Sequence, residues 1–115
     1  MPFINAKVTT TLSAEKKEEL KAALAKSVGL IGKAETWVMV NIEDKQDIWL
    51  GGKKKDSAGY ISIELVGKAD QKASETLSKA VCNVMENVLS IPSDSTYITI
   101  KEFDGYHWGW NNQTF

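Results

Sequence analysis

The chain has 115 residues, 43% hydrophobic and 25% charged, so residues 1–115 have the length and composition of a single globular domain. Fourteen lysines against fifteen acidic residues leave a net charge of −1, which disfavours a nucleic-acid-binding surface. Arginine is absent, which disfavours bidentate recognition of a carboxylate or phosphate. One cysteine, Cys82, and one histidine, His107, exclude an internal disulfide, a cysteine-rich zinc site and a multi-histidine metal centre.

No segment approaches the about 18 consecutive apolar residues of a membrane span. The first residues also lack the basic and apolar regions of a signal peptide. We therefore expect a cytoplasmic protein that binds neither membrane nor nucleic acid. A chain this short buries a modest core, which is compatible with an oligomer.

The first half of the chain predicts a strand, a helix and a second strand. Residues 3–8 alternate in polarity, Ser13 is a good helix N-cap, and Gly29 and Gly32 end a helical pattern. Residues 36–43 then alternate again, which predicts a strand. The inward positions of these elements are Ile4, Ala6, Val8, Leu20, Leu24, Val28, Ile31, Val38, Val40 and Ile42.

Residues 44–56 predict a loop, in which 48–50 form a short edge strand. The loop contains Gly51-Gly52 and the run Lys53-Lys54-Lys55. Three lysines can bind an anion, but exposed loop charge explains the run as well.

The second half repeats the pattern. Residues 60–66 alternate, Asp70 is a helix cap, Ile91-Pro92 ends the helix, and 96–103 form the fourth strand. The stripe predicted to be buried on the helix is Leu77, Val81, Val84 and Val88, with Cys82 and Met85 beside it.

The element order βαβ–βαβ predicts an α/β fold, more specifically an α+β two-layer sandwich. Parallel pairing within each half puts both helices on one face of a four-stranded mixed sheet. An interdigitated ferredoxin-like sheet has the same element order and is the alternative.

The sheet face opposite the helices is expected to carry five aromatic residues. The aromatic tail 105–115 has no apolar surface in its own chain on which it is expected to pack. A symmetric partner would cover both. The five are Phe3, Trp37, Tyr60, Tyr97 and Phe103.

Pro2 is the residue most suggestive of chemistry. Removal of Met1 would expose a secondary amine at the start of a strand. An α-amino group has a pKa of about 7.7–8.0, and burial or a nearby lysine lowers that pKa further. A neutral amine near pH 7 can act as a general base on a carbon acid. Proline after methionine also simply favours methionine removal.

The whole chain resembles the macrophage migration inhibitory factor family of the tautomerase superfamily. The resemblance rests on Met1-Pro2-Phe3-Ile4, Gly32-Lys33, Gly51-Gly52, Val66-Gly67, Tyr97-Ile98 and the ending Gly109-Trp110-Asn111-Asn112-Gln113-Thr114-Phe115. It implies two pseudo-symmetric βαβ units, a homotrimer, a keto–enol tautomerase that needs no cofactor and no metal, and a cytoplasmic protein that can be released without a signal peptide.

The resemblance also implies roles for individual residues. Pro2 and Lys33 match the catalytic proline and the pocket lysine, whose ammonium binds the substrate anion and lowers the pKa of the proline. Val66 matches a residue whose N–H binds substrate, and Tyr97 matches a tyrosine from the neighbouring subunit. An aromatic wall suited to an arylpyruvate would consist of Phe3, Trp37, Trp108, Trp110 and Phe115.

Some positions depart from the family pattern. Ser57–Tyr60 holds no cysteine pair, which excludes a thiol-oxidoreductase role. Glu64 stands in place of a histidine, Thr99 in place of an asparagine and Ala34 in place of a proline, changes that would retune substrate preference. His107, next to Trp108, is expected to be an exposed turn residue, with a position in the pocket as the alternative. Two alternatives to the enzyme remain: a cytokine-like trimer that binds a receptor, and a structural trimer that keeps an unused pocket.

Overall fold

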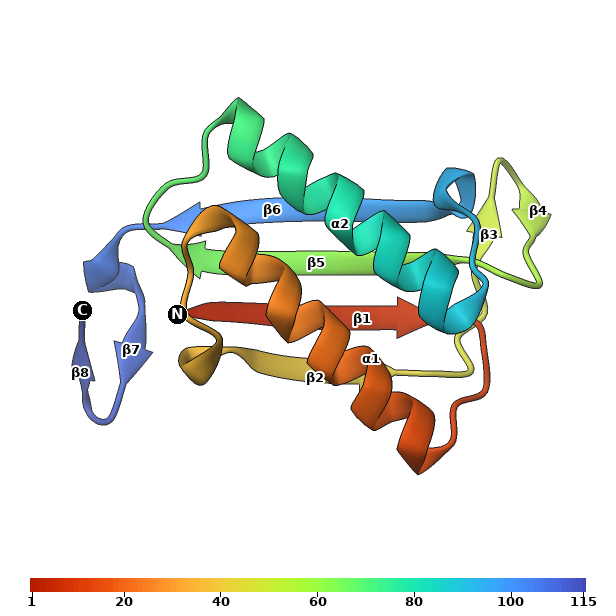
Figure 1. The fold of residues 1–115 in the computed structure, drawn as a ribbon, viewed down its shortest axis with the longest axis horizontal. Coiled ribbons are helices and arrows are strands. Elements are labelled where there is room, and N and C mark those ends of the chain that lie inside the picture. Colours follow the sequence, from red (N-terminus) through yellow and green to blue (C-terminus); the bar gives the residue numbers. More distant parts are fainter.

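A computed structural model describes all 115 residues as two layers, a four-stranded mixed sheet and two helices that cross one of its faces (Figure 1). Two short hairpins lie at opposite ends of the sheet (Figure 1). The main elements are β1 (Pro2–Val8), α1 (Ala14–Ser27), β2 (Met39–Glu43), β5 (Gly59–Val66), α2 (Gln71–Leu89) and β6 (Thr96–Phe103).

The sheet has the order β2-β1-β5-β6, so the two halves lie side by side. Strand β1 pairs in parallel with β2, and β5 in parallel with β6, while β1 and β5 form the central antiparallel pair. In this register Ile4 lies opposite Val40 on one side and Ile63 on the other. The two-layer prediction is confirmed, and the interdigitated alternative is excluded.

Helix α1 begins where the sequence predicts. The Ser13 side chain accepts the Lys16 N–H at 3.1 Å, which satisfies one of the free donors of the first turn. Leu20 and Leu24 are fully buried against the sheet. The regular helix stops at Ser27, earlier than predicted, because the chain tightens into a 3-10 helix (Val28–Ile31) that ends at Gly32, with φ of 79°.

Helix α2 is capped by Asp70, which accepts the Ala73 N–H at 2.8 Å. The predicted buried stripe is wrong in its second half, since Val84 and Val88 are only half-buried. An i, i+4 row faces the sheet instead. The helix ends before the predicted proline, at Ser90, whose φ of 56° is left-handed. The buried row is Leu77, Val81, Met85 and Leu89.

The region around β2 also differs from prediction. Residues Glu35–Trp37 form a 3-10 helix, closed by the Val38 N–H to the Glu35 carbonyl at 3.0 Å, so the strand starts three residues late. The predicted edge strand does not join the main sheet. Instead β3 (Trp49–Leu50) and β4 (Lys53–Lys54) form a separate hairpin, because Gly51 and Gly52 take positive φ values of 59° and 80° and close a tight turn.

The uncovered sheet face is less aromatic than predicted. Phe3, Tyr60, Tyr97 and Phe103 do occupy it by strand alternation. Trp37 does not, because the 3-10 helix removes it from β2. The middle of the face is polar: the Asn41 amide donates to the Asn5 side chain at 2.8 Å, and the Tyr60 hydroxyl lies 2.9 Å from the Thr99 hydroxyl.

The chain ends in a second hairpin at the N-terminal end of β1 (Figure 1). Two 3-10 helices, Ser93–Ser95 and Gly105–His107, precede β6 and the hairpin respectively. The hairpin strands are β7 (Gly109–Trp110) and β8 (Gln113–Thr114). None of the helices is both long and apolar enough to cross a bilayer.

Candidate functional site

A hollow of about 570 Å³ opens between the start of β1, the 3-10 helix before β2 and the C-terminal hairpin. This volume lies within the roughly 300–1,000 Å³ range of small-molecule sites. Eight of its thirteen lining residues are hydrophobic. The thirteen include five of the site residues implied by the family resemblance: Pro2, Phe3, Trp37, Trp108 and Trp110.

Pro2 opens β1 and is buried, opposite Leu65 of β5. The half-buried Met1 precedes it at the hollow. The pKa of the Met1 amino group is lowered below its ordinary value. Burial is the larger cause, and the positive charge of Lys33 is the smaller one. The start of β1 therefore lies in surroundings that favour a neutral amine.

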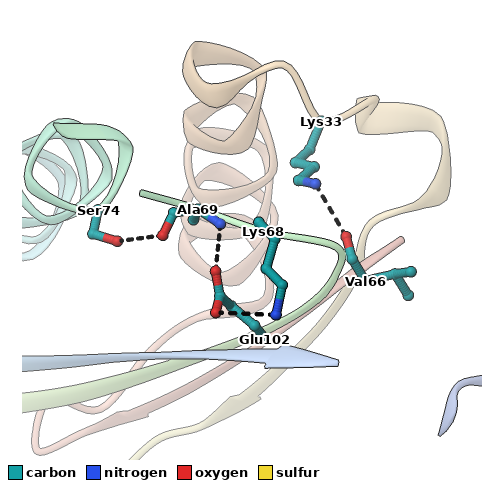
Figure 2. A network of polar contacts seen from close by, with 6 residues as sticks. All are labelled: Lys33, Val66, Lys68, Ala69, Ser74 and Glu102. Carbon is teal, nitrogen blue, oxygen red and sulfur yellow. Dashed lines mark hydrogen bonds and ion pairs between the residues drawn. The ribbon is translucent and has the colours of Figure 1, made fainter. Parts of the chain in front are cut away.

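Lys33 reaches this end of the sheet from the turn after α1. Its ammonium donates to the Val66 carbonyl at 3.0 Å, as Figure 2 shows. Gly67 leaves room for that contact: a Cβ on it would lie 3.3 Å from Lys33 Nζ, and its φ of 93° suits glycine. Lys33 and Val66 thus lie together beside the amino terminus, although neither lines the hollow itself.

The segment after β5 is held in place by a small polar network (Figure 2). Glu102 of β6 accepts the Ala69 N–H at 2.6 Å and lies 3.9 Å from the Lys68 ammonium. The Gly67 N–H donates to the Phe103 carbonyl at 2.9 Å. The two hydrogen bonds fix the backbone that follows Val66, and with it the carbonyl that orients Lys33. The Lys68 ion pair adds little to this, because the Lys68 side chain is 76% exposed.

The aromatic tail packs within its own chain, which corrects the expectation that it has no partner there. The Trp110 ring meets the Trp37 ring edge-on at 5.5 Å, and Trp108 meets Phe103 in the same way at 5.6 Å. Phe115 lies 6.2 Å from Trp110 but does not line the hollow. The tail therefore forms one wall of the hollow around Trp108 and Trp110.

Tyr97 is not brought to this hollow. It lies opposite Tyr60, which in turn lies opposite Lys7 near the far end of β1. Its side chain is 63% exposed on the uncovered sheet face. Within one chain, Tyr97 and Pro2 are thus at opposite ends of the sheet.

Several lining residues were missed by the sequence analysis as site residues. Glu64 and Met39 lie opposite Phe3 on either side of β1, a register that strand alternation alone does not give. His107 is exposed as expected, yet it lines the hollow, 4.2 Å from the Tyr106 ring. Thr36, Val38 and Phe103 complete this group. No three His, Cys, Asp and Glu side chains are grouped as metal ligands would be.

Comparisons with known proteins agree on one family. The family model described as macrophage migration inhibitory factor matches residues 1–115. Macrophage migration inhibitory factor of Xenopus laevis is 27% identical over 97 residues, 84% of this chain and 81% of that protein.

Solved structures agree as well. Leishmania major MIF2 has a TM-score of 0.89 at 25% identity, covering 100% of this chain and 97% of the other. The macrophage migration inhibitory factor homologue of Prochlorococcus marinus has a TM-score of 0.88 at 27% identity, covering 98% of each chain.

Proposed function

This chain belongs to the macrophage migration inhibitory factor family, and we propose that it is a cofactor-free keto–enol tautomerase with Pro2 as its general base. The proposal rests on one observation above all. The start of β1 lies at an apolar hollow, and there burial and the Lys33 ammonium lower the pKa of an amino group. Removal of Met1 would place that amino group on Pro2.

The reaction moves one proton and changes no oxidation state. In the keto-to-enol direction, the Pro2 nitrogen takes a proton from the carbon next to the carbonyl. The C–H electrons form the C=C bond while the carbonyl π electrons move to oxygen. The protonated amine then returns its proton to the oxygen, which gives the enol and restores the neutral base.

Lys33 would stabilise the charge that develops on oxygen or bind the substrate carboxylate. Its ammonium has three N–H donors, and the Val66 carbonyl engages one of them. The Val66 N–H is proposed as a second donor to the substrate. The neighbouring aromatic wall would hold the flat ring of an arylpyruvate. That wall is Phe3, Trp37, Trp108 and Trp110, and the Phe115 ring lies next to that of Trp110.

The proposal includes a homotrimer in which each site is shared. Tyr97 is too far from Pro2 of its own chain to act with it, and it is exposed on the uncovered sheet face. A neighbouring copy that packs on this face would carry its own Tyr97 towards Pro2 of the first chain. The cytoplasmic location expected from the sequence stays a prediction.

Subunit exchange tests the shared site. Light scattering should give three times the monomer mass. Mixing inactive Pro2→Gly chains with inactive Tyr97→Ala chains, under exchange proven by labelled subunits, should restore part of the activity. A monomer, or a trimer that exchanges without recovering activity, would refute the sharing.

An enolic arylpyruvate assay on protein of known N-terminus tests the base. Protein starting at Pro2, verified by intact mass, should convert the enol to the keto form. Pro2→Gly should lower kcat/KM by about 10²–10⁴-fold, the usual contribution of a general base. Retention of Met1, which turns the Pro2 nitrogen into an amide, should have a similar effect. Full activity of Met1-retaining protein would exclude Pro2 as the base.

A further inference from the structure

Glu64 is the only acidic residue that lines the hollow. It lies on β5 directly opposite Phe3, and its side chain is half-buried on the uncovered sheet face. The rest of the lining around it is largely aromatic or apolar. A carboxylate in such a wall is costly to desolvate unless a partner meets it.

The carboxylate of Glu64 has no partner in the chain. It takes part in none of the five ion pairs and in none of the side-chain hydrogen bonds. Lys101 lies opposite it on β6 and would be its natural cross-strand partner. The Lys101 ammonium instead lies over the Phe103 ring, 5.2 Å from its centroid. Within one chain, Glu64 is thus left without a charge partner.

Two opposite charges therefore lie at different places in the region of the site. Lys33 supplies a positive charge beside the amino terminus, where its ammonium donates to the Val66 carbonyl. Glu64 supplies a negative charge on the sheet face of the hollow, which Trp37, Trp108 and Trp110 also line. A ligand whose carboxylate is held near Lys33 would extend into the hollow and bring its other end near Glu64.

We propose that Glu64 determines charge specificity at this site, favouring aryl keto acids with a positively charged substituent on the ring and rejecting a second carboxylate. The inference rests on the proposed tautomerase function and adds a residue that selects the substrate. When a ligand displaces water from the hollow, a cation near the carboxylate is stabilised. A second anion there meets an uncompensated like charge, which weakens binding.

Three arylpyruvate enols test the proposal: the unsubstituted ring, a para-aminomethyl ring, which is cationic, and a para-carboxy ring, which is anionic. Wild type should convert the cationic substrate best and the anionic one worst, with kcat/KM at least tenfold apart. Glu64→Gln keeps the side-chain shape and removes the charge. It should reduce that ratio by about tenfold or more.

Glu75→Gln serves as the matched control, because Glu75 lies on α2 in the other layer, where its side chain accepts from Gln71. It removes the same charge and should leave the substrate ratio unchanged. Circular dichroism establishes that both variants are folded, and the wild-type ranking is informative without either variant. A ratio that Glu64→Gln leaves at the wild-type value, or a wild type without charge preference, would overturn the proposal.

A binding measurement separates this proposal from the tautomerase proposal itself. The corresponding 3-arylpropanoates lack the ketone and therefore cannot tautomerise, and Trp37, Trp108 and Trp110 report their binding by fluorescence. If wild type converts no enol, the tautomerase proposal fails. A charge preference in Kd that Glu64→Gln abolishes would still support Glu64 as the selecting residue. Equal Kd values, or no binding of any of the three, would contradict it.

Discussion

Replacing Lys33 with methionine should weaken substrate binding and change the pH dependence of the reaction together. The Lys33 ammonium uses one N–H on the Val66 carbonyl at 3.0 Å, which leaves two donors for a substrate anion. A hydrogen bond to a charged group contributes about 1.5–3 kcal/mol. The loss of one such bond corresponds to a rise of about 10- to 150-fold in KM for a carboxylate substrate.

The same substitution removes a positive neighbour of the amino group. Burial is the larger cause of the lowered pKa and Lys33 the smaller, so the amine pKa should rise but stay below its ordinary value. Because the neutral amine is the base, the acid limb of the kcat/KM profile should move to higher pH. The assay is enol conversion from pH 5 to 9, with an enol that lacks a carboxylate as second substrate.

Lys68→Met is the matched control for Lys33→Met. It removes the same charge from a neighbouring residue whose ammonium is directed at Glu102 (Figure 2). KM and the acid limb should stay at wild-type values in this variant. If Lys33→Met also leaves both unchanged, or raises KM equally for the substrate without a carboxylate, Lys33 is not an anion-binding group.

Two further outcomes follow from the structure. Gly67→Ala should destabilise the fold by about 1–2 kcal/mol in urea denaturation, since its φ of 93° disfavours a side chain. It should also raise KM, because the new Cβ would displace the Lys33 ammonium. Gly52→Ala is the control: with φ of 80° and no atom within 4 Å of a new Cβ, it should destabilise the fold without altering KM. The Leu12 N–H and the Lys17 ammonium lower the pKa of Asp44, so its contribution to stability is complete above the unfolded pKa of about 3.9 and is lost as pH falls through the lower folded pKa. Asp44→Asn should therefore flatten the fall in stability below pH 4, and an unchanged slope would refute the assignment.

The regular elements were predictable because each has its own local signal. Ser13 and Asp70 cap helices, and alternation in 60–66 and 96–103 reports two strands with one buried face. The errors lie where tertiary contacts override such signals. Residues 36–38 alternate like a strand but close a 3-10 turn, and the helix stripe at Val84 and Val88 gives way to the row through Met85.

The candidate site was predictable only in part, since it depends on register between distant strands. Resemblance to the family pointed to Pro2, Trp37 and Trp108, all of which line the hollow. Glu64 was noted as a departure from the family but not as a lining residue. Its place became clear only when the pairing of β1 with β5 set it opposite Phe3. Alternation indicates which face a residue occupies, and register decides what it meets there.

The proposed base is a backbone amine, so its position depends on the main chain of β1 and not on a side-chain rotamer. An amine at a chain terminus is located by the backbone, and most termini fray unless they are held in place. Here the terminus begins β1, which is a central strand paired on both sides, with Phe3 opposite Met39 and Glu64. The Pro2 ring fixes φ and lacks an N–H, so it adds little freedom of its own. Catalysis should therefore be sensitive to changes that loosen the β1–β5 pairing far from the hollow, because they let the base move.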